Sequence, residues 1–229
     1  MKKSFLQGLV SSIIHLYLVK KYNARKYIRE HIRDCRMYIR RKLYKMPSND
    51  ISLFCNNCTA GCVCHDMGLR FNSPTVNLII EPSDFVEFLS NLEYYSNKEV
   101  LEYPQGYEKY NCPTGIIDNK VKIYFIHYNS FEEARAKWEA RCKRINIKKC
   151  YFILSERDGC SFQDLENFDK LDNCVKKVEF VHEQYPSLEN QFVIGPDVNN
   201  PLEAAVMTDW IGLGGARIYD SFNWIEWLK

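Results

Sequence analysis

Apolar residues recur along the chain with two spacings, which predict its strands and helices. Short apolar runs between turn residues predict strands over residues 51–54, 75–80, 121–127, 150–154, 175–181 and 192–194. Apolar positions spaced three and four apart predict helices over residues 59–67, 83–95, 130–141 and 162–171. Strands that alternate with helices form a sheet covered on both faces, so we expect a three-layer α/β/α fold with a parallel or mixed sheet.

The first 46 residues have a different pattern. Apolar positions at helical spacing over residues 5–19 and 22–44 predict basic helices. This segment has thirteen Lys and Arg against two acidic residues, whereas the remainder has eighteen basic and twenty-seven acidic residues. A break at Met46-Pro47-Ser48-Asn49-Asp50 follows. We therefore expect a basic helical segment over residues 1–46 and an α/β domain over residues 51–229.

The charge of the N-terminal segment leaves two interpretations open. A basic amphipathic helix can lie on an anionic membrane surface, which would place the chain at the cytoplasmic face of the membrane. The other interpretation is a solvated helix docked on the acidic body. The apolar stretch over residues 5–19 is shorter than the ~20 residues needed to span a bilayer. No recognisable nucleic-acid-binding module accompanies the basic residues, so we expect no nucleic-acid partner.

The ten cysteines bear on the compartment and on metal binding. The N-terminal residues do not have the pattern expected of a cleavable signal peptide, and the chain exceeds the usual size of a disulfide scaffold, so we expect free thiols in the cytoplasm. Four cysteines and His65 gather between residues 55 and 65, but zinc usually takes two separated ligand pairs. We expect no metal and no cofactor. The alternatives at residues 55–65 are a small metal-binding cysteine cluster and small buried thiols that pack a helix on a sheet.

The residues around Cys58 have the order strand, tight turn, helix N-terminus. Unpaired N–H groups of a first helical turn favour a thiolate there. His127 and Asp158 also follow predicted strands, and ligands of α/β sheets bind beyond the carboxyl ends of strands. Cys58 as nucleophile, His127 as base and Asp158 as orienting carboxylate would suit acyl or glycosyl transfer. The structural alternatives are a backbone-bonded histidine and a turn aspartate.

A second candidate constellation is basic. Lys137, Arg141 and Arg144 recur at intervals of four and three, so they share one helix face. Arginine pairs bidentately with phosphate or carboxylate, which predicts an anionic ligand. Salt bridges with the acidic body are the alternative.

Several motifs resemble one bacterial family. They are Asn56-Asn57-Cys58, Gly68-Leu69, Phe71, Ser73-Pro74-Thr75, His127-Tyr128-Asn129-Ser130, Glu133-Ala134, Lys137-Trp138, Arg141, Arg144-Ile145-Asn146, Arg157-Asp158-Gly159-Cys160, Phe168 and Trp227-Leu228. Over residues 51–229 the chain resembles the domain of unknown function 1919, which is often labelled exopolysaccharide biosynthesis protein. The resemblance implies an α/β fold and a role near the synthesis of surface polysaccharide, without a reaction.

The chain departs from this family around Cys58. The family usually has serine at position 55 and Trp-Gly-Gly at positions 59–61, whereas the chain has Cys55 and Thr-Ala-Gly. Cys58 matches the family, so Asn56, Asn57 and Cys58 are the best candidates from this segment for a pocket shared with His127 and Asp158.

Two classes of function follow from the sequence. The first is a transferase or hydrolase that uses a Cys58–His127 pair on a glycan precursor, such as a sugar nucleotide or a lipid-linked glycan. The second is a non-catalytic binding or assembly factor at the inner face of the membrane, located by residues 1–46.

Overall fold

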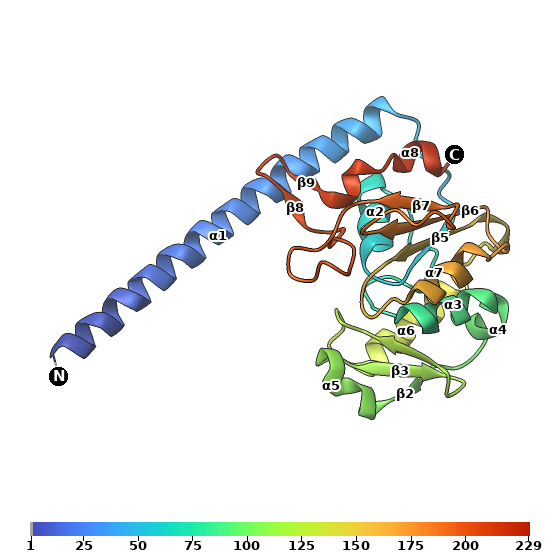
Figure 1. Cartoon of the computed structure of the whole chain (residues 1–229), viewed down its shortest axis with the longest axis horizontal. Helices are drawn as coiled ribbons and strands as arrows, with labels where there is room; N and C mark the ends of the chain where they lie inside the picture. The colour runs from blue at the N-terminus through green and yellow to red at the C-terminus, as the bar shows by residue number, and fades with distance from the viewer. Residues whose placement is uncertain (1) are drawn as a thin grey trace. The chain divides into compact units, whose positions relative to one another are not determined.

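A computed structural model of the chain describes the backbone of residues 2–229 (Figure 1). It describes side chains from Val19 onward. The chain forms two compact units. The smaller unit contains the N-terminal residues up to Lys45 together with Asp209–Arg217, and the larger contains Met46–Thr208 and Ile218–Lys229.

The smaller unit is built on one continuous helix, α1 (Lys2–Leu43), so the two expected helical stretches are joined. The short strands β8 (Trp210–Ile211) and β9 (Ala216–Arg217) form an antiparallel hairpin. A Cβ atom at Gly215, which has φ 67°, would lie 2.8 Å from the Arg29 carbonyl oxygen, so this close approach requires glycine. Arg33 and Arg36 donate hydrogen bonds at 2.9 Å to the carbonyl oxygens of Gly215 and Gly214. Within residues 2–229, no helix is long and apolar enough to cross a membrane.

The larger unit is built on a four-stranded parallel sheet, which confirms the α/β class. Its strands are β1 (Ser52–Cys55), β5 (Cys150–Ser155), β6 (Lys176–Val181) and β7 (Gln191–Val193), in the order β1-β5-β6-β7. Every residue of β1 and β5 is buried, as expected for strands covered on both faces. The apolar runs of the sequence therefore predicted these strands correctly.

Helices cover both faces of this sheet (Figure 1). On one face lie α2 (Thr59–Met67) and α8 (Trp224–Trp227). The other carries α3 (Pro82–Ser90), α6 (Phe131–Cys142) and α7 (Phe162–Asp169), with α4 (Leu92–Ser96) after α3. Serine hydroxyls cap two of them, since Ser130 accepts from Glu133 N–H and Ser161 forms a capping box with Asp164. The helix expected over residues 83–95 is interrupted at Asn91.

A second sheet is antiparallel and was not expected. It consists of β2 (Leu101–Glu102), β3 (Thr114–Ile117) and β4 (Val121–Tyr124). The β3–β4 turn carries Asp118 and Asn119 at φ 52° and 53°, the left-handed pair that suits a tight hairpin. The short helix α5 (Tyr107–Tyr110) and the 3-10 turns Pro104–Gly106, Ile147–Lys149 and Ile218–Ser221 complete the elements.

The expected strand over residues 75–80 is wrong. Within it, only an isolated bridge between Ile79 and Tyr124 pairs as a strand would, and Asn77 has φ 63°, which an extended strand does not permit. Instead, this segment covers the outer edge of β1. Ile80 N–H donates to the Asn56 carbonyl oxygen at 2.9 Å, and Cys55 N–H donates to Thr75 Oγ1 at 3.1 Å.

Candidate functional site

The turn between β1 and α2 holds two of the predicted ligand-binding residues. Asn56 is fully buried, its Nδ2 donates to the Ser155 carbonyl oxygen at 3.2 Å, and its Oδ1 accepts from Ser155 N–H at 2.9 Å. Asn57 Oδ1 accepts from Thr59 N–H at 3.1 Å at the start of α2. Both amide side chains are thus bonded to the protein backbone. Asn56 extends the β1–β5 ladder, and Asn57, one residue before the N-cap position of α2, accepts from the first N–H of the helix.

Cys58 lies at the N-cap of α2, as its sequence position predicted, but its electrostatics differ from the expectation. Burial is the largest effect, and the neighbouring thiols of Cys62 and Cys55 add to it, so the pKa of Cys58 rises to about 12. The sulfur lies 3.9 Å from the Leu78 carbonyl oxygen. Burial in this setting outweighs the effect of the helix terminus, so the thiol form is favoured over the thiolate.

His127 and Asp158 do not form a hydrogen-bonded triad with Cys58. His127 is exposed in a turn after β4. Because β4 belongs to the antiparallel sheet and β1 to the parallel sheet, the ends of these two strands need not meet at one sheet edge, as the prediction had assumed. Asp158 follows β5 with φ 58°, and burial raises the pKa of its carboxyl. Between residues 19 and 229 no hydrogen bond joins any two of these three side chains. Their catalytic role stays a prediction.

The carboxyl ends of β5 and β6 bring together a different pair, Glu156 and His182. Glu156 is the residue after β5, and His182 is the residue after β6. Glu156 Oε2 lies 2.8 Å from His182 Nδ1 and also accepts from His182 N–H at 2.8 Å. Tyr185 donates its hydroxyl to Glu156 Oε1. The carboxylate is 6% exposed and the imidazole 13%, so both groups lie largely out of water.

This geometry fixes the tautomer of His182. A carboxylate can only accept, so Nδ1 carries a proton and donates to Glu156, and in the neutral imidazole Nε2 is then the nitrogen with the lone pair. Nε2 lies 3.6 Å from Oε1 of Glu183, whose side chain is 66% exposed. An imidazole held in this way can take a proton from a substrate or from water.

A loop beside this pair is held by Arg157. Its Nη1 donates to Asp197 Oδ2 at 3.1 Å and to the Ala204 carbonyl oxygen, and its Nη2 lies 3.5 Å from Glu203. Ala204 N–H in turn donates to the Glu156 carbonyl oxygen at 2.9 Å. The loop over residues 195–205 is therefore tied to the end of β5, directly beside Glu156.

The predicted basic face is only partly assembled. Lys137 is exposed, whereas Arg141 is 9% exposed and donates to the Val76 carbonyl oxygen at 3.1 Å and to the Tyr128 hydroxyl at 2.6 Å. Nε of Arg144 is buried without a partner. Burial and the positive charges of Arg70 and Arg141 lower the pKa of Arg144. No carboxylate among the described residues lies within 4 Å of Arg70, Arg141 or Arg144, so no protein carboxylate pairs with these three guanidinium groups.

The comparisons with known proteins place the chain in a family. The model of the domain of unknown function DUF1919 matches residues 24–229. The chain belongs to the DUF1919 family. A Haemophilus influenzae protein, described as an uncharacterized protein, is 31% identical over 196 residues, which cover 85% of this chain and 92% of that protein. The DUF1919 match begins within α1, earlier than the resemblance to residues 51–229 indicated.

Sequence reasoning on this DUF1919 chain missed Glu156, Tyr185 and Arg70. The usable signal for Glu156 was its position one residue beyond a buried strand, the same position that His182 has on the next strand. The cysteines near residue 60 behave as small apolar residues, since Cys55 and Cys64 are buried in the core. All ten cysteines are free thiols, and the described residues contain no cluster of three His, Cys, Asp or Glu suited to a metal ion.

Proposed function

We propose that this chain is a hydrolase or group transferase in which His182 is the general base and Glu156 orients it. One observation carries the proposal: the 2.8 Å contact between a buried carboxylate and Nδ1 of an imidazole at the carboxyl ends of two adjacent parallel strands. In the reaction, Nε2 takes a proton from water or from an acceptor hydroxyl as that oxygen forms a bond to the substrate. The bond between the transferred group and the leaving group breaks, and the imidazolium returns the proton to the leaving group. Such a base contributes about 10²–10⁴-fold to a rate.

The substrate class proposed is a precursor of a surface glycan, such as a sugar nucleotide or a lipid-linked glycan. This part rests on the label often given to the family, with a cytoplasmic setting at the inner face of the membrane. The three arginines at positions 70, 141 and 144 support an anionic substrate, because guanidinium groups without carboxylate partners favour phosphate.

The test is turnover of model substrates by the full chain and by single variants. Release of nitrophenol from p-nitrophenyl esters and glycosides, and of UDP from UDP-sugars, is measured against pH. His182→Gln should lower kcat by about 10²–10⁴-fold. Glu156→Gln should lower kcat as well, because a glutamine amide can donate a hydrogen bond to Nδ1 and so favour the wrong tautomer. His65→Gln is the matched control, since the His65 side chain is 74% exposed.

Two outcomes would reject this assignment. The first is turnover that His182→Gln leaves unchanged. The second is turnover that depends on Cys58 and His127 while His182→Gln remains active, which would favour the pair expected from the sequence.

A non-catalytic anion-binding factor is the second candidate, and the three arginines without carboxylate partners favour it. It predicts that UDP binds the wild type and His182→Gln equally, that Arg144→Met weakens this binding, and that no model substrate is turned over.

A further inference from the structure

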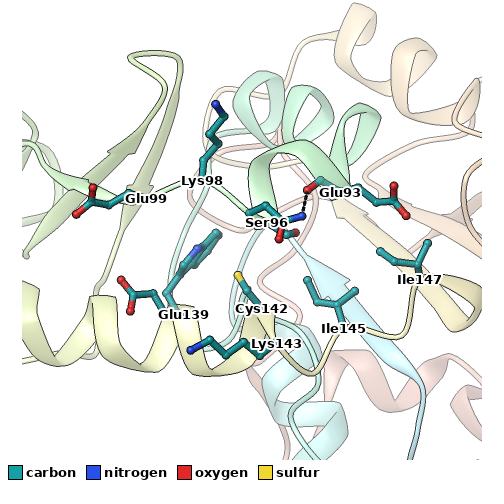
Figure 2. A pocket seen from close by; sticks show the side chains of 11 residues that line it. Glu93, Ser96, Lys98, Glu99, Glu139, Cys142, Lys143, Ile145 and Ile147 are labelled. Atoms are coloured by element: carbon teal, nitrogen blue, oxygen red, sulfur yellow. Dashed lines mark hydrogen bonds between the residues drawn. The ribbon is translucent and has the colours of Figure 1, made fainter.

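A pocket of about 530 Å³ opens beside α4 and α6, and neither Glu156 nor His182 lines it (Figure 2). Ser96 and Lys98 contribute from the end of α4 and the segment after it, and Trp138, Cys142 and Lys143 from α6 and its C-terminal turn. Its volume is in the range that holds a small ligand.

Two residues of this pocket carry buried polar atoms without partners. Trp138 is 1% exposed and packs its ring against Phe88 and Phe125, at centroid distances of 5.6 and 6.4 Å. Its Nε1 is buried and makes no hydrogen bond, and the same holds for Ser96 Oγ. Buried indole N–H groups usually find an acceptor. The unpartnered donors therefore indicate a ligand that can accept hydrogen bonds.

The positive and negative charges around the pocket are nearly balanced, so they do not favour a charged ligand. Two lysines, Lys98 and Lys143, and three carboxylates, those of Glu93, Glu99 and Glu139, line the pocket. Two of these carboxylates already have a cation nearby, because Arg135 lies 3.5 Å from Glu99 and 3.9 Å from Glu139. Asn97, whose Nδ2 donates to the Glu93 carbonyl oxygen at 2.7 Å, and the apolar side chains of Cys142, Ile145 and Ile147 complete the lining.

We propose that this pocket binds a neutral polyhydroxylated ligand of monosaccharide size. Ligand hydroxyl oxygens would accept from Trp138 Nε1–H and exchange a hydrogen bond with Ser96 Oγ. Other hydroxyls would donate to the pocket carboxylates, while the C–H face of the ligand packs on the apolar side chains. Neither an anion nor a purely apolar molecule satisfies all these groups together. The proposal is independent of His182, which belongs to the end of β6.

The indole N–H of Trp138 is the reporter for the test. The chain has four tryptophans, so a ¹H–¹⁵N spectrum shows four indole signals, and the one missing from the Trp138→Phe spectrum is that of Trp138. The full chain is titrated with glucose, galactose, mannose and N-acetylglucosamine, and separately with inorganic phosphate and acetate. The expected result is a saturable shift of the Trp138 signal with at least one sugar, at a Kd of about 1–10 mM.

A matched pair of serine variants tests the contact. Ser96→Ala should weaken binding of that sugar about tenfold, the loss expected for one hydrogen bond. Ser90→Ala is the control, because Ser90 Oγ donates to the Val86 carbonyl oxygen at 2.8 Å and does not line the pocket. Unchanged affinity in Ser96→Ala would overturn the proposal. So would the absence of a saturable shift with every sugar up to about 100 mM. A Trp138 shift produced by phosphate or acetate alone would assign an anion site instead.

Discussion

Glu179 is a carboxyl group in the interior with no hydrogen-bond partner. It lies within β6, is fully buried, and neither of its oxygens has a partner. Burial is the main cause, and the negative charge of Asp169 adds to it, so the pKa of Glu179 rises to about 8. Ionisation of this buried carboxyl would therefore lower the stability of the folded state.

Replacing Glu179 with glutamine should remove a pH dependence of folding. Between pH 4.5 and about 8 the folded state holds a proton that the unfolded state has released. Stability from this group is thus fully present below pH 4.5 and is lost as pH rises through about 8. Urea unfolding at pH 6 and pH 8 should show a decrease of about 1 kcal/mol or more in the wild type that is absent from Glu179→Gln.

The exposed Glu189 provides the control for this measurement. Glu189→Gln should retain the wild-type decrease between the two pH values. A decrease of the same size in Glu179→Gln would mean that another group causes it, and would contradict the prediction.

At the scale of elements, the β1–β5 pair is completed by a side chain. Asn56→Ala should lower the free energy of unfolding by about 1–3 kcal/mol, because it leaves the buried N–H of Ser155 unpaired, whereas the Ser155 carbonyl oxygen keeps the Arg157 N–H as a donor. Urea unfolding measures this change, and Asn129→Ala, at an exposed position, should leave stability within about 0.5 kcal/mol. If Asn56→Ala is as stable as the wild type but loses ligand binding, then Asn56 is the ligand-binding residue that the sequence suggested.

The local pattern of apolar residues predicted the strands of the parallel sheet. It could not predict which strands pair with one another, and this is why His127 was grouped with Cys58. Apolar runs located β1, β5, β6 and β7, and the pattern of residues 59–67 gave the bounds of α2. The run over residues 121–127 predicted a strand, of which residues 121–124 form β4. It could not show which sheet contains this strand, because pairing depends on residues far away in the sequence. The grouping of His127 with Cys58 depended on that pairing.

The candidate site shows the same limit. The parallel sheet was expected to gather chemistry at its carboxyl ends, and Glu156 and His182 do meet there. Their partnership required knowing that β5 and β6 are adjacent and in which register. The expectation that the helix terminus favours a Cys58 thiolate was wrong for a different reason. The position of Cys58 in the sequence indicates a helix terminus, but it does not show how deeply the thiol is buried, and burial raises its pKa.

At the scale of the whole molecule, the chain has a net charge of only +2, yet its basic residues concentrate in α1. Within the described side chains of this helix, apolar residues are exposed among the basic ones, including Tyr22, Ile28, Ile39 and Leu43. The basic residues Lys20, Arg25 and Lys42 of α1 are exposed, so each can be replaced by glutamate without disturbing buried contacts. Exposed apolar and basic residues on one helix are the features with which peripheral helices bind anionic lipid.

We expect the full chain to sediment with vesicles that contain phosphatidylglycerol and not with neutral phosphatidylcholine vesicles, and to be released as salt is raised, because screening weakens such attraction. Each surface cation contributes about 1 kcal/mol near an anionic bilayer, so Lys20→Glu, Arg25→Glu and Lys42→Glu together should weaken binding by at least about 100-fold. A control with the same change in net charge reverses three exposed lysines of the larger unit, Lys137, Lys148 and Lys170. Equal losses in the two triple variants would mean that net charge alone governs binding. Retained binding in the α1 variant would exclude this helix as the membrane contact.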